Sequence, residues 1–174
     1  MEQYRKTPRA RFLDYDSGDY FITICTKGRK HYFGEIKDSE MIRSAIGDFV
    51  NAQLEKCSEF CRSISIPVFV VMPNHIHFIV SLTGVVAANG YEQRSPNAAL
   101  RANPTSQRHV PALSKYITSL KGAVTKHAKM LNLEFGWQSR YHDHLIRGSE
   151  DGNRISEYII NNVAKWHQDC FNEE

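Results

Sequence analysis

The chain has 174 residues, of which 41% are hydrophobic and 24% charged, with a formal net charge of +3 at pH 7. This length and composition exclude a disordered or fibrous chain and predict that residues 1–174 form one domain. No apolar run reaches the roughly 18 residues of a membrane span, and the N-terminus lacks the apolar region of a signal peptide. The four cysteines show no CxxC pair, so we expect a cytoplasmic protein with reduced thiols.

The first half of the chain predicts a strand, a helix and a hairpin. Residues 20–26, YFITICT, are rich in aromatic and β-branched side chains, as strands are. From Met41 to about Phe60 apolar residues recur at helical spacing. The runs Ser65–Met72 and His75–Leu82 predict two further strands, and the turn residues between them favour a tight hairpin.

The second half predicts a long loop, a helix, a strand and a last helix. Residues 84–111 have no periodicity and predict a mobile loop. A second helix is expected from Leu113 to about Asn132, a strand-like run after Gly136, and a helix from near Asn153. This order is the split βαβ pattern of an α+β, ferredoxin-like fold. Its antiparallel sheet carries two helices on one face, and the other face is free for a site beside the appended C-terminal helix.

The third predicted strand carries the most informative pattern. With a period of two, His75 and His77 project from one face and Ile76 and Phe78 from the other. Two imidazoles about 7 Å apart along a strand can chelate one metal ion if their rings converge. On its own, a bare His-x-His more often marks half-buried histidines that hydrogen-bond to their neighbours.

Residues 72–80, MPNHIHFIV, resemble the His-hydrophobic-His signature strand of the REP-associated tyrosine transposases. These proteins are insertion-sequence transposase-like members of the single-tyrosine HUH endonuclease superfamily. The resemblance covers about residues 12–168 in the expected order, through segments at 15–16, 20–26, 33–34, 137–147 and 158–162. It implies a metal-dependent transposase that acts on single-stranded or hairpin DNA. The catalytic tyrosine attacks the scissile phosphate, which leaves a 5′-phosphotyrosine and a free 3′-hydroxyl.

The resemblance also assigns the site residues. Tyr158 matches the nucleophile, His75 and His77 the metal ligands, and Asn162 the third ligand, four residues after Tyr158 on the same helical face. An amide oxygen is a hard donor suited to Mg²⁺ or Mn²⁺. Val163 stands where relatives usually carry proline, which would let the helix continue unbroken.

Basic residues predict the DNA contacts. Arg9 and Arg11 belong to a basic N-terminal cluster that could track a phosphate backbone. Lys121 matches a basic position of the family and is a candidate phosphate contact. Arg140 and Arg147 are candidates on the same grounds. Each of these cations could equally belong to a solvated face. The sequence leaves open whether the active unit is a monomer or a homodimer.

Three alternatives stay open at this point. A zinc-dependent hydrolase would use His75 and His77 together with His142 and His144 as ligands. A domesticated DNA-binding protein would keep the fold without cleaving. Within the transposase chemistry, Tyr141 is the main rival to Tyr158, because it lies two residues before Asp143 in the late strand-like run.

Overall fold

A four-stranded antiparallel sheet is the centre of the computed structural model, which describes residues 17–83 and 112–172. The strands β1 (Gly18–Cys25), β4 (Ile64–Met72), β5 (His75–Leu82) and β6 (His142–Leu145) lie in the order β4-β5-β1-β6. This order has the first and third long strands side by side in the middle, as the ferredoxin-like prediction requires. The predicted loop at 84–111, Arg9 and Arg11 lie outside the described residues.

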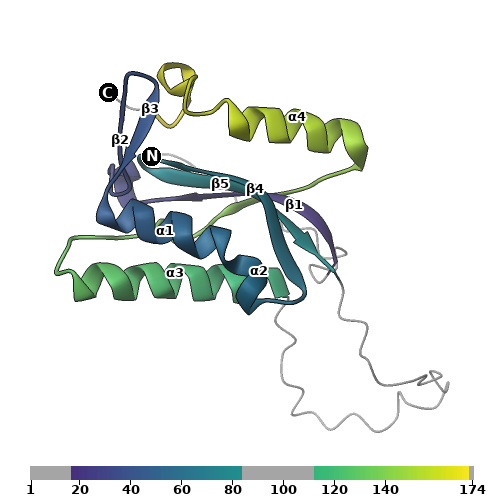
Figure 1. The fold of residues 1–174 in the computed structure, drawn as a ribbon, viewed down its shortest axis with the longest axis horizontal. Coiled ribbons are helices and arrows are strands. Elements are labelled where there is room, and N and C mark those ends of the chain that lie inside the picture. The colour runs from purple at the N-terminus through teal and green to yellow at the C-terminus, as the bar shows by residue number, and fades with distance from the viewer. Residues whose placement is uncertain (1–16, 84–111, 173–174) are drawn as a thin grey trace, which may run out of the picture.

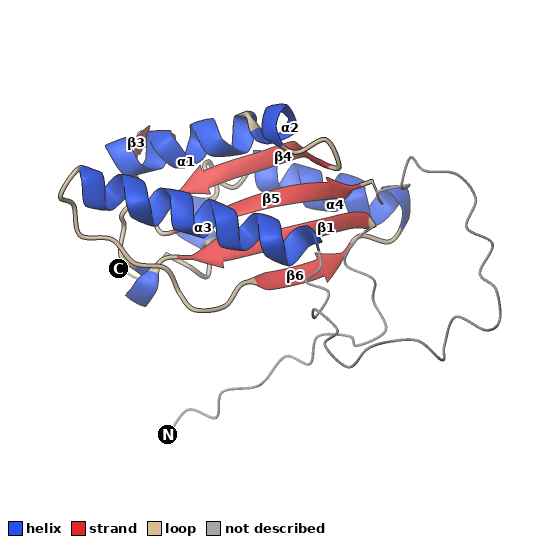
Figure 2. Cartoon of the chain, turned by 90° about the horizontal axis from the view of Figure 1, so that it is seen from below, coloured by secondary structure: helices blue, strands red, loops and turns tan. Residues whose placement is uncertain are grey.

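Helices cover both faces of the sheet. Figure 1 shows α1 (Ala45–Glu55) and α3 (Ala112–Met130) on one side and α4 (Gly148–Ile160) on the other. In Figure 2 the sheet is seen through α1 and α3, with α4 behind it. The α+β class, the two helices on one face and the appended C-terminal helix are confirmed. None of the helices in the described part of the chain is long and apolar enough to cross a membrane.

The helix predicted from Met41 begins later than expected. Residues 34–43 form a small hairpin of β2 (Gly34–Lys37) and β3 (Glu40–Arg43) instead. Asp38 and Ser39 between them both have positive φ, which is the geometry of a two-residue type I′ turn. The α1 helix starts after Ser44, whose hydroxyl accepts from the Gly47 amide at 3.1 Å and so caps the helix. Helical spacing alone therefore misplaced the start.

The C-terminal third also differs from its prediction. The last helix, α4, begins at Gly148 rather than near Asn153. The strand expected after Gly136 begins only at His142, as β6. The prediction that Val163 lets the helix continue is wrong, because α4 ends at Ile160. Asn162 therefore lies just beyond the helix, in a turn that leads to a short 3-10 helix, η3 (Trp166–Gln168). Shorter elements elsewhere are α2 (Cys57–Phe60) and the 3-10 helix η1 (Lys27–Arg29).

The two faces of β5 belong to two different packing layers. Ile76, Phe78 and Val80 are fully buried in the main core, between the sheet and helices α1 and α3. Ile79 faces the other way and packs with Ile155 and Ile159 of α4. The alternation predicted from the sequence is confirmed, and it aims both histidines at the α4 side of the sheet.

Candidate metal centre and nucleophile

His75 and His77 lie side by side and fully buried on the α4 side of β5. Their side chains are 0% and 1% exposed, and the ring centroids are 4.4 Å apart. The antiparallel register pairs His77 with Thr23 of β1, on the same face of the sheet. The rings converge closely enough for both to contact one ion.

Neighbouring side chains fix the orientation of both rings. The His75 Nδ1 lies 2.8 Å from the Asn74 Oδ1, and the Asn74 Nδ2 donates to the Phe171 carbonyl at 2.8 Å. An amide oxygen only accepts, so the Nδ1 of His75 must carry the proton and its Nε2 must carry the lone pair. The Nδ1 of His77 lies 2.8 Å from the Thr23 Oγ1, and this hydroxyl oxygen can accept a hydrogen bond from the ring in the same way. Such partners are the usual support of metal-binding histidines.

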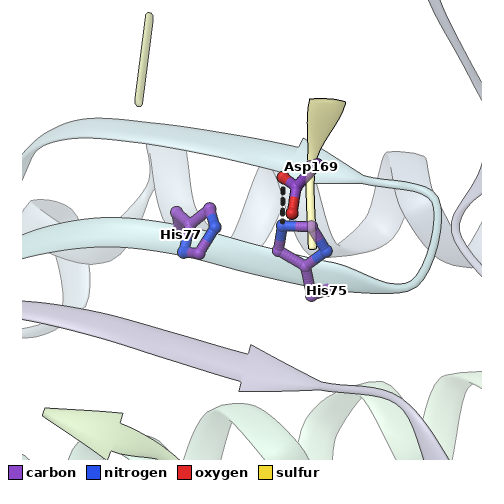
Figure 3. Close-up of side chains that lie close together, drawn as sticks. All are labelled: His75, His77 and Asp169. Atoms are coloured by element: carbon purple, nitrogen blue, oxygen red, sulfur yellow. Dashed lines mark ion pairs between the residues drawn. The ribbon is translucent and has the colours of Figure 1, made fainter. Parts of the chain in front are cut away.

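Asp169 joins the two histidines, although the sequence did not predict it. One ligand atom from each of His75, His77 and Asp169 lies within 4.8 Å of the others. Figure 3 shows the Asp169 carboxylate over the His75 ring, and the dashed line joins the Oδ2 and Nε2 atoms, 3.8 Å apart. The other carboxylate oxygen accepts from the Phe171 amide at 2.9 Å. This group of residues could hold a metal ion.

Unsatisfied acceptors point to a cation at this position. Among the described residues, the buried His75 Nε2, Asp169 Oδ2 and Asn162 Oδ1 atoms have no hydrogen-bond partner. Buried polar atoms without a partner are costly and rare, so each calls for an explanation. Two lone-pair atoms facing each other at 3.8 Å repel unless a positive charge lies between them. The residues therefore fit a hard divalent cation with nitrogen and oxygen ligands.

Burial keeps the imidazoles in the form that binds metals. Burial, together with the neighbouring His77 and Arg29 side chains, lowers the pKa of His75 to about 2. Burial likewise lowers the pKa of His77 to about 3. Both rings are therefore neutral at physiological pH, and the contact between His75 and Asp169 is not an ion pair between opposite charges.

Tyr158 reaches the same centre from α4. Its hydroxyl lies 3.2 Å from the His77 Nε2, and the residue is 44% exposed. Burial raises the pKa of the Tyr158 phenol, the Asp169 carboxylate raises it further, and a hydrogen bond from Asn162 opposes this. The phenol thus lies between the buried histidine and the surface, with Asn162 beside it. The structure brings together all four residues predicted for the reaction centre.

The rival tyrosines lie on the other side of the sheet. The Tyr141 hydroxyl is 3.5 Å from the Ser114 Oγ of α3, and Tyr141 packs against the main core. Tyr116 is a buried residue of α3 itself. Neither phenol faces the layer that contains the histidines.

The four-histidine zinc site is not assembled. His144 of β6 pairs instead with Asp151, at 2.9 Å between its Nε2 and the Oδ2. The metal-compatible group among residues 17–83 and 112–172 contains Asp169 and neither His142 nor His144.

The predicted DNA-binding cations differ in their surroundings. The Lys121 ammonium donates to the carbonyls of Gln138 and Arg140, at 2.7 and 3.3 Å, and so ties α3 to the segment before β6. Arg140 and Arg147 are exposed, and Arg147 immediately precedes α4. Their contact with DNA stays a prediction, as does that of Arg9 and Arg11, which lie outside the described residues.

Comparisons with known proteins give a relative in sequence and a solved structure with a similar fold. No family model matches the chain. An uncharacterized protein of Haemophilus influenzae is 32% identical over 169 residues, which are 95% of this chain and 92% of that protein. A solved REP-associated tyrosine transposase, bound to a REP hairpin, superposes with a TM-score of 0.57 and 18% identity. That match covers 95% of this chain and 74% of the transposase.

Proposed function

Since the chain belongs to the same family as the Haemophilus influenzae protein and has the fold of the REP-associated tyrosine transposase, we propose that it is a metal-dependent DNA transposase. It cleaves and rejoins single-stranded or hairpin DNA through a covalent 5′-phosphotyrosine. The observation that carries this proposal is the Tyr158 hydroxyl, 3.2 Å from His77 in a group of unsatisfied buried acceptors.

The metal ligands in this proposal are His75, His77 and Asp169, with Asn162 as a further oxygen donor beside the phenol. Carboxylate and amide oxygens favour Mg²⁺ or Mn²⁺, and the two imidazoles make Mn²⁺ the better match of the pair. A divalent ion in this group would supply Lewis-acid chemistry, polarising a phosphoryl oxygen and balancing the charge of the transition state. The protein's own contribution is to hold neutral, oriented imidazoles that need no reorganisation.

Tyr158 provides the nucleophile. Its phenolic oxygen forms a bond to phosphorus while the bond from phosphorus to the 3′ oxygen breaks, so the phenol loses a proton and the 3′ oxygen gains one. The phosphotyrosine retains the energy of the phosphodiester, and attack by a 3′-hydroxyl reverses the step without a nucleotide cofactor. Because the negative charge of Asp169 raises the pKa of the phenol, neutralising this carboxylate favours the phenolate.

The DNA lies over the α4 side of the sheet in this proposal, since Tyr158 is exposed there. Arg147 at the start of α4 and the exposed Arg140 are the phosphate contacts of the described residues, and Arg9 and Arg11 supplement them. Each phosphate contact releases counterions, so binding should weaken as salt increases.

A covalent-adduct assay tests the proposal. Labelled single-stranded and hairpin oligonucleotides from the flanks of the gene are incubated with the protein and Mn²⁺ and run on a denaturing gel. The wild type and a Tyr141→Phe control should form a slow-migrating adduct, and mass spectrometry should locate the linkage on the peptide that contains Tyr158. Tyr158→Phe removes only the hydroxyl and should bind DNA without forming an adduct. An adduct in Tyr158→Phe would refute the assigned nucleophile, and DNA binding without any adduct in the wild type would favour a non-cleaving DNA-binding protein.

A further inference from the structure

A cavity of about 490 Å³ opens directly beside Tyr158, on the outer side of the reaction centre. Its lining residues come from three elements: Phe21 of β1, His144 of β6, and Arg154, Ile155 and Tyr158 of α4. Phe21 and His144 are direct partners in the antiparallel register, so the strand pairing itself builds the floor. The volume lies within the range of roughly 300–1,000 Å³ that small-molecule pockets occupy.

Phe21 connects this cavity to the metal centre. Its ring stacks on His77, with centroids 5.2 Å apart and planes 29° apart, and meets Tyr158 edge-on at 6.1 Å. A group that contacts Phe21 in the cavity therefore meets a ring that also packs on a metal-site histidine. Ile155, which is almost fully buried, gives the cavity an apolar wall.

The polar groups of the cavity are held in place by one carboxylate. Asp151 accepts from the Arg154 Nη2 at 2.7 Å, from the His144 Nε2 at 2.9 Å and from the Arg147 amide at 3.2 Å. Hydrogen bonds from His144 and Arg154 lower the pKa of Asp151 to about 2, so it stays ionised at neutral pH. The Arg154 side chain, which lines the cavity, is 74% exposed.

We propose that this cavity binds one unpaired base of the DNA strand, next to the phosphate that Tyr158 attacks. This inference rests on the proposed function for its ligand and adds a binding site that the chemistry does not require. The base stacks against Phe21 and packs on Ile155, while Arg154 covers it from the solvent side. Stacking on aromatic and guanidinium groups is the usual way in which proteins hold single-stranded bases.

The charges favour a base over a phosphate in this position. Asp151 already neutralises Arg154, and its ionised carboxylate would repel a second anion. The Phe21 ring and the Ile155 side chain offer a phosphate no hydrogen bonds, whereas they match the flat apolar faces of a base. Only an unpaired base can enter, because a base pair keeps both faces stacked within the helix.

An abasic scan tests the pocket without depending on cleavage. The Tyr158→Phe protein, in chelator, is titrated with labelled gene-flank oligonucleotides in which one nucleotide at a time lacks its base. One position, or two adjacent positions, should lose affinity by about 5-fold or more, as expected for one stacked base. Adding Phe21→Leu or Arg154→Ala should weaken binding of the intact oligonucleotide. At the sensitive position alone, it should also remove the difference in affinity between the intact and the abasic oligonucleotide. Arg62→Ala, an exposed arginine outside the cavity, is the matched control and should leave the scan unchanged.

The outcomes separate the pocket from the chemistry. A scan with no sensitive position, or a sensitive position that persists in both pocket variants, overturns the pocket even where the wild type forms its adduct. A sensitive position abolished by the pocket variants supports the pocket even where no adduct forms. Because Phe21 also touches His77, Mn²⁺ affinity of Phe21→Leu is measured in parallel, and an unchanged value assigns its effect to the base. No binding to any oligonucleotide overturns both proposals.

Discussion

The two faces of β5 are both buried, but they differ in chemistry where the histidines lie. Ile76 and Phe78 on one face and His75 on the other are all 0% exposed. The first two contact an apolar core closed by α1 and α3, where burial stabilises the fold. His75 lies under the chain's C-terminal segment, against acceptors that have no hydrogen-bond partner. The apolar face contributes stability along its length, whereas the histidine end of the other face retains a costly arrangement that a bound cation would relieve.

The sharpest way to break this comparison is to substitute one residue on each face. Phe78→Ala should lower the free energy of unfolding by about 3–5 kcal/mol, because it opens a cavity in the main core. His77→Leu should change it little, because burying a leucine gains roughly 1.5–3 kcal/mol and orphaning the Thr23 hydroxyl costs a similar amount. Urea denaturation of both variants without metal measures this. A loss for His77→Leu as large as that for Phe78→Ala would make the histidine face a structural core like the other.

The histidine face should also make stability depend on pH. The folded-state pKa values of His75 and His77, about 2 and 3, lie below the ordinary value of 6.5. The unfolded chain therefore binds more protons below pH 6.5, and stability falls as the pH drops from 6.5 towards 3. At pH 5 each buried histidine should lower the free energy of unfolding by up to about 2 kcal/mol relative to pH 7.5. Urea denaturation at the two pH values should give a smaller change in the free energy of unfolding for His77→Leu than for the wild type. An equal change would show that other groups cause the pH dependence.

A smaller effect is expected from the residue that orients His75. Asn74→Ala removes the acceptor for the His75 Nδ1 proton and should weaken Mn²⁺ binding by about 10- to 100-fold. Asn74→Asp restores this acceptor but cannot donate to the Phe171 carbonyl, so it separates ring orientation from attachment of the C-terminal segment. Calorimetric titration of both variants measures the effect. Equal weakening in both would assign the role of Asn74 to the segment rather than to the ring.

Local patterns in the sequence predicted much of this arrangement, and their limits are physical. The alternation of β5 gave the faces of His75 and Ile76 because side chains in a strand have a strict period of two. The resemblance identified Tyr158 and Asn162, although Asn162 reaches the phenol from a turn rather than from the helix face. Asp169 lies just beyond the matched residues, and only the fold of the C-terminal segment over His75 brings it to the site. No spacing along the chain encodes such a long-range contact.

The hairpin of β2 and β3 was missed for a related reason. Met41 and Ile42 fit a helical pattern continued by the true helix, and the turn at Asp38 and Ser39 contains no glycine. Because type I′ turns are recognised mainly by glycine or asparagine, a turn at Asp38-Ser39 gives a weak signal.

Calorimetric titration with Mn²⁺ tests the central claim most directly. The wild-type protein should bind one ion per chain at the His75, His77 and Asp169 group, and His77→Ala and Asp169→Asn should each weaken binding strongly. His144→Ala should bind as the wild type does, because His144 pairs with Asp151 outside this group. Binding that survives His77→Ala and Asp169→Asn unchanged, or that is lost in His144→Ala, would contradict the assignment of the metal centre.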